Sequence, residues 1–237
     1  RDVEFLSATE HFDTAQPMGR AMLNICIVFA QLERETIQAR VLDTYADRSR
    51  QGFYMGGRVP FGFTLCAFQR SGIHTACYAP VPAEAAAVRR MYALYAAEGM
   101  TLGETARQLQ SEGIFRRSGQ EWTASRLREL LKNPIYCRAD VQVLSFFRAQ
   151  GTEPVNAAAD FIGRNGCYLF RGKSADKRTD LRGACLVLAP HEGLVDGGVW
   201  LICREKLMSG SRSGSGRRGQ SSWLCGIVRC AACMRAL

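Results

Sequence analysis

The chain has 237 residues, 47% of them hydrophobic and 22% charged, which is enough apolar material for one large core or two modest ones. Its net charge of +9 is unevenly spread: residues 1–50 carry six basic and eight acidic side chains, whereas residues 209–237 carry five basic and no acidic ones. This asymmetry favours a polyanionic partner for the later segments and a protein partner for the first. The longest apolar run, residues 21–30, is too short to cross a bilayer, so we expect no membrane partner.

The cysteines and the first residues indicate a cytoplasmic location. Seven of the ten cysteines stand alone in apolar or strand-like stretches, which is typical of buried reduced thiols and not of a disulfide framework. No targeting segment is visible at the start. Because a strand-like pattern at residues 2–7 follows Arg1 at once, we expect the start to be a cut within a longer protein.

A long helix is predicted from Pro17 to Gln51. Pro17 suits a first helical turn, and nothing breaks the pattern before Gly52. Such a helix would extend about 50 Å, which is more than one small core needs. It therefore bridges domains or pairs with a copy of itself, unless it is simply a long core helix. Its apolar stripe, the expected oligomer interface, consists of Met18, Met22, Ile25, Phe29 and Leu32.

The next segments predict a hinge, a hairpin and a helix. Closely spaced glycines and aromatic residues between residues 52 and 63 are typical of a hinge followed by a packed turn. Residues 64–78 alternate weakly and predict a hairpin around Ser71-Gly72. Pro82 then opens a helix over residues 83–97, which Gly99 ends.

Residues 101–132 predict two helices in a helix-turn-helix arrangement. Thr101 caps the first helix, Gly113-Ile114 turns the chain, and Thr123 caps a second helix that ends at Lys132. Basic residues on the second helix suit a DNA groove, although ordinary helical hairpins share this outline. In this region we expect DNA contacts from Arg116, Arg117, Arg126, Arg128 and Lys132.

A small β-rich insertion is predicted for residues 138–190. Its strand-like runs are Asp140–Phe147, Cys167–Phe170 and Ala184–Leu188. An amphipathic helix should follow over Leu194–Met208. Residues 209–222, rich in Ser, Gly and Arg, then predict a flexible basic linker and a domain boundary.

The sequence after this linker contains a C-x-x-C pair, Cys230 and Cys233. A structural zinc ion needs four ligands, so the pair would supply half a site, with Cys225 a poorly spaced third candidate. A redox pair is the rival interpretation, but it lacks a thioredoxin-like context. We assign His191 to the entry of a helix. No other pattern suggests a catalytic site, a catalytic metal or a bound nucleotide.

Several of these motifs, taken in order, resemble the large serine recombinases. Residues 7–14, 17–20 and 30–37 resemble the end of the catalytic domain and its long helix. Residues 56–63, 84–95 and 133–136 look like the recombinase domain, and residues 223–233 are similar to the first half of a zinc ribbon. Met234 departs from the pattern, because a glycine usually follows this cysteine pair.

The resemblance implies an α+β, multi-domain, helix-rich chain. The expected order is the end of a resolvase-type catalytic domain (1–16), a long oligomerisation helix (17–51), a helix-turn-helix-like recombinase domain (52–137), a β-rich segment with a helix (138–208), a flexible linker (209–222) and the first knuckle of a zinc ribbon (223–237).

The resemblance also implies site-specific DNA integration, excision or transposition by strand exchange through a phosphoserine intermediate. The nucleophilic serine is expected upstream of Arg1, so the fragment alone should be inactive. Expected partners are double-stranded DNA at attachment sites and further copies of the chain, as a dimer or tetramer. Zinc is the expected structural cofactor, held by Cys230 and Cys233. The DNA-contacting set gains Arg34, Arg40 and Arg58.

The sequence leaves two other functions open. One is a helix-turn-helix transcription regulator with a dimerising helix, which the turn at residues 56–63 and the strand before the long helix disfavour. The other is a zinc-ribbon interaction module, which the incomplete ligand set disfavours.

Overall fold

The computed structural model describes residues 16–70, 72–170 and 181–213. The chain divides into two compact units, Arg1–Gly56 and Gly57–Leu237. The strand predicted at residues 2–7 lies outside the described residues, as do most of the linker and the C-x-x-C pair. Helices and small sheets occur together in the described residues, so the predicted α+β class is confirmed.

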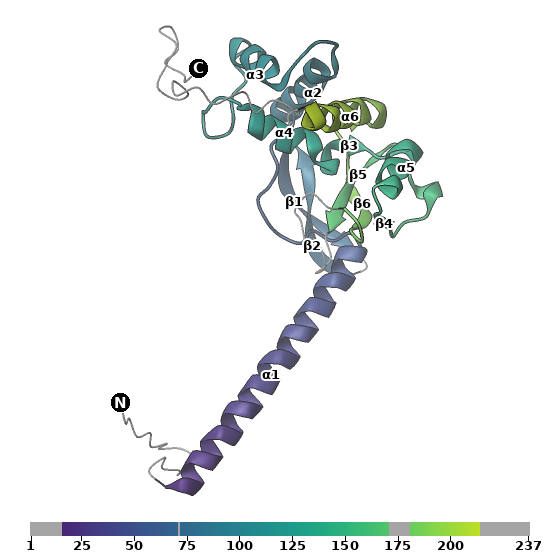
Figure 1. Cartoon of the computed structure of the whole chain (residues 1–237). Coiled ribbons are helices and arrows are strands. Elements are labelled where there is room, and N and C mark those ends of the chain that lie inside the picture. The colour runs from purple at the N-terminus through teal and green to yellow at the C-terminus, as the bar shows by residue number, and fades with distance from the viewer. Residues whose placement is uncertain (1–15, 71, 171–180, 214–237) are drawn as a thin grey trace, which may run out of the picture. The chain divides into compact units, whose positions relative to one another are not determined.

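The first unit contains the long helix α1 (Pro17–Arg50), which Figure 1 shows as one unbroken rod. Proline is favoured in the first turn of a helix, where α1 has Pro17. Arg48 and Arg50 lie in its last turn, where positive charge interacts favourably with the negative end of the helix dipole. The helix ends where Gly52 adopts a φ of 74°. The predicted helix is thus confirmed. None of the described helices is long and apolar enough to span a membrane.

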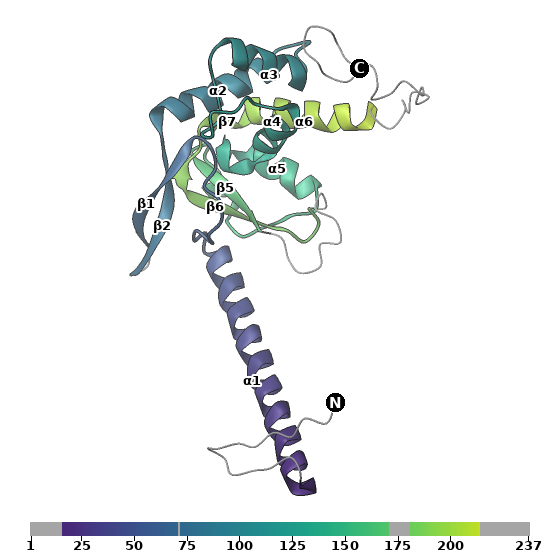
Figure 2. The same ribbon diagram turned by 90° about the vertical axis from the view of Figure 1, so that its left-hand side faces the viewer.

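The second unit begins with a hairpin of β1 (Phe63–Arg70) and β2 (Ile73–Pro80). The strands pair antiparallel from Phe63 opposite Pro80 to Arg70 opposite Ile73. Gly72 has a φ of 77°, as a tight turn requires. The hairpin predicted over residues 64–78 is confirmed, and it projects from the side of the unit (Figure 2).

Helices gather at one end of the second unit, where α2 (Pro82–Ala96), α3 (Leu102–Ser111), α4 (Ala124–Lys132) and α6 (Gly197–Ser213) lie together (Figure 1). Thr101 and Glu104 form the capping box of α3, and the Thr123 side chain caps α4. The first three helices are confirmed as predicted. Trp200 on α6 is fully buried, and its ring centroid lies 5.8 Å from that of Phe146 and 5.6 Å from that of Phe147.

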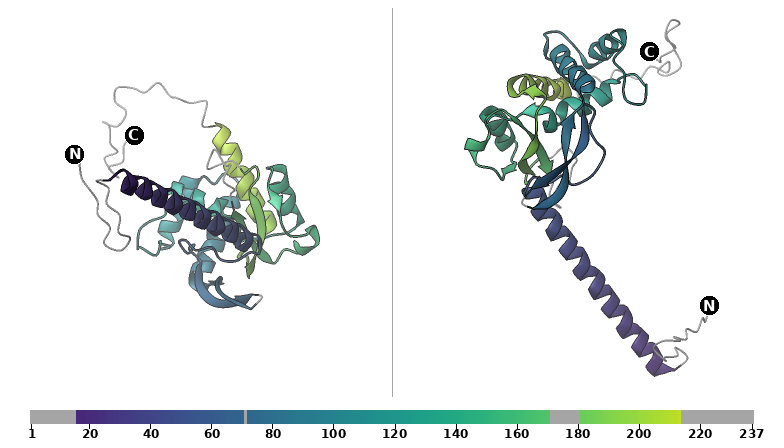
Figure 3. Two further views of the ribbon diagram at one scale, coloured as in Figure 1. Left: turned by 90° about the horizontal axis from the view of Figure 1, so that it is seen from below. Right: turned by 180° about the vertical axis from the view of Figure 1, so that it is seen from behind.

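Short strands and turns fill the opposite side of this unit (Figure 3). A three-stranded sheet has the order β4 (Glu153–Pro154), β6 (Cys185–Glu192), β5 (Asn165–Phe170). A parallel pair joins β3 (Cys137–Arg138) to β7 (Val195–Asp196). The remaining elements are the 3-10 turns η1 (Pro134–Tyr136) and η2 (Ala158–Asp160) and the helix α5 (Val141–Ala149).

The strand predicted over Asp140–Phe147 is wrong, because this segment is helix α5. The Asp140 side chain accepts a 2.8 Å hydrogen bond from the Val143 amide and so caps the helix. Val143, Leu144 and Phe147 then point inward at helical spacing. The strands predicted at Cys167–Phe170 and Ala184–Leu188 correspond to β5 and β6.

The helix predicted over Leu194–Met208 is displaced by a few residues. It begins at Gly197, because Val195 and Asp196 pair with β3 as a short strand. Gly193 and Gly197 allow the close approach, since a Cβ at Gly193 would lie 2.2 Å from the Cys137 carbonyl oxygen. At its other end α6 continues to Ser213, inside the segment predicted as a linker.

An aromatic cluster around His191 joins the hairpin to the sheet. The ring centroid of His191 lies 5.1 Å from that of Phe63, 5.3 Å from that of Tyr78 and 5.6 Å from that of Tyr168. Its Nε2 lies 3.0 Å from the Ile135 carbonyl oxygen. Burial lowers the pKa of His191 to about 4, so the ring is neutral at neutral pH. Its prediction as a helix-entry residue is wrong, because it lies in β6.

Candidate nucleic-acid interface

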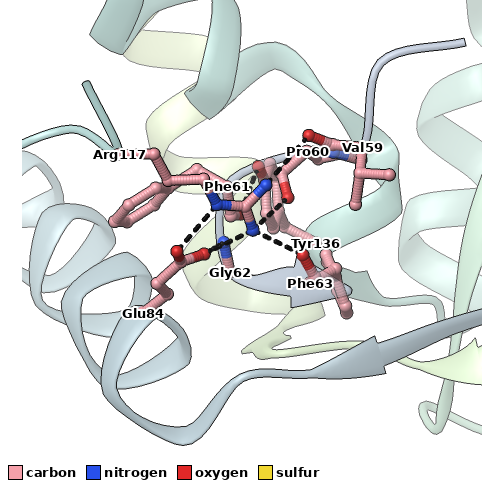
Figure 4. Close-up of polar contacts among 8 residues, drawn as sticks. All are labelled: Val59, Pro60, Phe61, Gly62, Phe63, Glu84, Arg117 and Tyr136. Atoms are coloured by element: carbon pink, nitrogen blue, oxygen red, sulfur yellow. Dashed lines mark hydrogen bonds and ion pairs between the residues drawn. The ribbon is translucent and has the colours of Figure 1, made fainter. Parts of the chain in front are cut away.

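Arg117 and Glu84 form a two-pronged ion pair (Figure 4). Nε of Arg117 donates to Oε1 of Glu84 at 2.7 Å, and Nη2 donates to Oε2 at 2.6 Å. The same guanidinium donates to the carbonyl oxygens of Val59, Pro60 and Phe63. The hydrogen bonds that Arg117 donates to the Glu84 carboxylate hold the pKa of Glu84 below its usual range. One side chain thus ties the loop before α4 to α2 and to residues 59–63.

Residues 59–63 are fixed from two further directions. The Gly62 amide donates to Oε2 of Glu84 at 2.7 Å, and the Tyr136 hydroxyl donates to the Phe61 carbonyl at 2.8 Å. Gly62 has a φ of 98°, and a Cβ there would lie 3.0 Å from Val88. Both the conformation and the space therefore require glycine at this turn.

A pocket of about 430 Å³ opens between this turn and α4. Four of the arginines expected to contact DNA line it: Arg58, Arg116, Arg117 and Arg126. Aromatic rings line it as well, and Phe61 meets Trp122 edge to face with ring centroids 5.1 Å apart. Glu129 also lines the pocket and pairs with Arg126 at 3.1 Å. The result is a concave basic surface with apolar walls.

The other predicted residues of α4 lie outside the pocket. Arg128 and Lys132 are half-buried. Partial burial lowers the pKa of Lys132, and the positive charges of Arg204 on α6 and of Arg128 lower it further. Sequence reasoning did not single out Arg204, because it belongs to a helix more than seventy positions along the chain. The structure thus adds a cation beside the basic residues of α4.

The predicted stripe on α1 is exposed in the chain as described. The exposed fractions are 78% for Met18, 48% for Met22, 51% for Ile25, 66% for Phe29 and 57% for Leu32. Arg34 and Arg40 are exposed on the same helix. Exposure of large apolar side chains to water is unfavourable, so this stripe is a surface that a partner could cover.

Cys230 and Cys233, the predicted zinc ligands, lie outside the described residues. Within residues 16–70, 72–170 and 181–213, no cluster of three or more His, Cys, Asp and Glu side chains could hold a metal ion.

Sequence reasoning missed the role of Glu84 and the internal contacts of Arg117. No local pattern reveals them, because Arg117 is 33 positions from Glu84 and 54 from Phe63. Only the folded chain brings the three together.

Comparison with known protein families gives two matches. Residues 82–209, more than half of the chain, match the model Recombinase, and residues 1–54 match Resolvase, N terminal domain. No curated protein and no solved structure matches the chain. A resolvase-type segment followed by a recombinase domain is the order that the motifs predict. The chain therefore belongs to the large serine recombinases.

Proposed function

We propose that this chain supplies DNA binding and self-association to a site-specific recombinase that exchanges DNA strands through a phosphoserine intermediate. The family implies a serine that attacks a DNA phosphodiester, and we place that serine upstream of Arg1. The chain as it stands would then bind and assemble without cutting. Incubation with supercoiled plasmid tests this, since nicked or linear product would contradict it.

The observation that carries the DNA-binding part is the gathering of Arg58, Arg116 and Arg126 at one pocket beside α4. Arginine forks match the geometry of phosphate oxygens, and a hollow lined by rings limits the water that competes for them. We assign the base-reading role to the helix-turn-helix formed by α3 and α4, with Arg128 and Lys132 near the DNA backbone. Arg34 and Arg40 would contact DNA from α1.

Salt dependence tests this assignment. The logarithm of the binding constant for duplex DNA should fall linearly with the logarithm of salt concentration, because bound cations release counterions. Replacing Arg126, Arg128 and Lys132 together by alanine should reduce that slope by about 3, because each of these cations would neutralise one phosphate. Fluorescence anisotropy with a labelled duplex of random sequence measures it. An unchanged slope would contradict the placement of α4 on DNA.

The exposed stripe on α1 supports self-association into dimers or tetramers. Phe29→Asp places a charge in the middle of the stripe and should shift the chain toward monomer in sedimentation velocity. Ile27→Asp is a matched control, because Ile27 is similarly exposed at 54% but lies on the opposite side of the helix. Equal effects of the two variants would argue against the stripe as the interface.

We extend the proposal to zinc, with Cys230 and Cys233 as two thiolate ligands of a structural site. Metal analysis of the purified chain tests it. After incubation with zinc, the chain should bind more of the ion than the Cys230→Ser, Cys233→Ser double variant does, because the variant lacks both thiolates. Equal zinc content in both proteins would contradict the assignment.

A further inference from the structure

Two acidic side chains adjoin the basic pocket, and they have different contacts. Glu129 lines the pocket and is 67% exposed, and within the described residues it forms an ion pair with Arg126 alone, three residues earlier on the same helix. Glu84 is 20% exposed and binds both the Gly62 amide and the fork of Arg117. A negative charge near a DNA-binding surface normally weakens binding through repulsion. That repulsion applies to both carboxylates, but only Glu84 also joins separate parts of the fold.

The guanidinium of Arg117 is occupied by the protein itself. Its Nε, Nη1 and Nη2 atoms all donate to protein acceptors, two of them to Glu84 (Figure 4). The group also lies over the ring of Phe61, 5.9 Å from the ring centroid. A phosphate would have to displace these contacts to bind Arg117. Arg117 thus differs from Arg126, which donates to Glu129 through Nη1, because all three guanidinium nitrogens of Arg117 already donate to the protein.

Arg58 and Arg116 differ from Arg117 in this respect. Arg58 directly precedes Val59, and Arg116 directly precedes Arg117, so the backbone that carries each of them is held by the hydrogen bonds of Arg117. No carboxylate in the described part of the chain pairs with either side chain. The walls between them are Phe61 and Trp122. Two of the pocket cations, Arg58 and Arg116, thus have no acidic partner within the described residues. The third, Arg126, pairs with the exposed Glu129, which a phosphate group could replace.

We propose that the pocket takes one phosphodiester group of the DNA backbone between Arg58, Arg116 and Arg126, and that Arg117 and Glu84 position the segments that carry these arginines. This inference rests on the proposed DNA-binding function and deepens it. The phosphate would replace Glu129 as the partner of Arg126, while the rings of Phe61 and Trp122 border the neighbouring sugar. Arg117 becomes a positioning residue and not a direct contact.

The two carboxylates give opposite predictions. Glu129→Gln removes a competing charge and should tighten binding of a labelled random-sequence duplex by a few-fold. Glu84→Gln removes the same charge but breaks the two-pronged ion pair, and it should weaken binding on the order of tenfold. Simple electrostatics predicts tighter binding for both. Equal or tighter binding by Glu84→Gln would therefore overturn the positioning role.

Conservative replacement of Arg117 gives a second readout. Arg117→Lys keeps the positive charge, which a direct phosphate contact would tolerate, but it removes the planar fork that reaches Glu84 and the carbonyls together. We expect this variant to weaken binding about as much as Glu84→Gln, and the double variant to be no weaker than either single one. Additive effects in the double variant would overturn the idea that the pair acts as a unit.

Variants outside the ion pair keep the pocket testable if Glu84→Gln unfolds, which circular dichroism at the assay temperature would reveal. Arg58→Ala and Arg116→Ala should each stay folded and lower the salt slope by about one. Slopes unchanged in both would overturn the phosphate pocket while leaving the DNA-binding function intact. Failure of the unaltered chain to bind DNA would overturn the proposed function and this inference together.

Discussion

Acidification should destabilise the second unit through His191. The ring is 4% exposed among Phe63, Tyr78 and Tyr168, and Gly166 lies against its Nε2, where even a Cβ would come within 2.5 Å. Protonating it would bury a charge with no acidic partner among these neighbours. Protonation of His191 is therefore less favourable in the folded state than in the unfolded state.

The sign and size follow from the pKa of His191, about 4 in the folded chain against an ordinary value of 6.5. Because the folded pKa is the lower one, the contribution to stability is complete above pH 6.5 and is lost as the pH falls toward 4. One pKa unit corresponds to about 1.4 kcal/mol, so moving from about pH 7 to about pH 5 should lower the free energy of unfolding by about 2 kcal/mol.

Urea unfolding at the two pH values measures this decrease, with the fluorescence of the fully buried Trp200 as a reporter of the second unit. His191→Gln retains an amide donor toward the Ile135 carbonyl but cannot titrate. The decrease in its free energy of unfolding between about pH 7 and about pH 5 should therefore be smaller than that of the unaltered chain by about 2 kcal/mol. The two proteins have the same carboxylates, so the contribution of these groups to the pH dependence cancels in the comparison. The same pH dependence in both proteins would refute the assignment of a neutral buried ring.

Two further changes test the packing around the pocket and the cluster. Gly166→Ala would place a Cβ 2.5 Å from the Ile135 carbonyl oxygen, so the unfolding midpoint in urea should fall markedly, and a midpoint equal to that of the unaltered chain would contradict this packing. Tyr136→Phe removes the 2.8 Å hydrogen bond to the Phe61 carbonyl and should lower the free energy of unfolding by about 1 kcal/mol in the same assay, whereas an unchanged free energy would mean that the bond contributes nothing to stability.

Local signals explain why much of the helical structure is predictable. Pro17 and Pro82 mark helix starts, and Thr101 and Thr123 cap helices where the structure places caps. Gly72 marks the turn of the hairpin. Each signal acts within a few residues, so sequence alone carries it.

Segment 140–147 shows how a local reading can fail. Its valines and phenylalanines favour a strand by composition, but the Asp140 cap and the inward spacing of Leu144 and Phe147 favour a helix. Packing of α5 against α6 gives the helical face a partner and settles the competition.

Contacts between distant positions are what the sequence could not reveal. The basic character of Arg116, Arg117 and Arg126 is visible in the sequence, but their surroundings are not. Arg117 binds Glu84 and Phe63, which lie in other elements, and this separates it from arginines that lack an acidic partner. His191 likewise acquires its pKa from rings on three different strands.

Hydrogen–deuterium exchange with and without duplex DNA tests most directly whether this chain holds DNA through the basic pocket and α4. We expect slower exchange on DNA binding in residues 58–63, 115–122 and 124–132, and no change in β5 and β6, neither of which lines the pocket. Unchanged exchange in the first three segments, or slowing centred on β5 and β6, would contradict it.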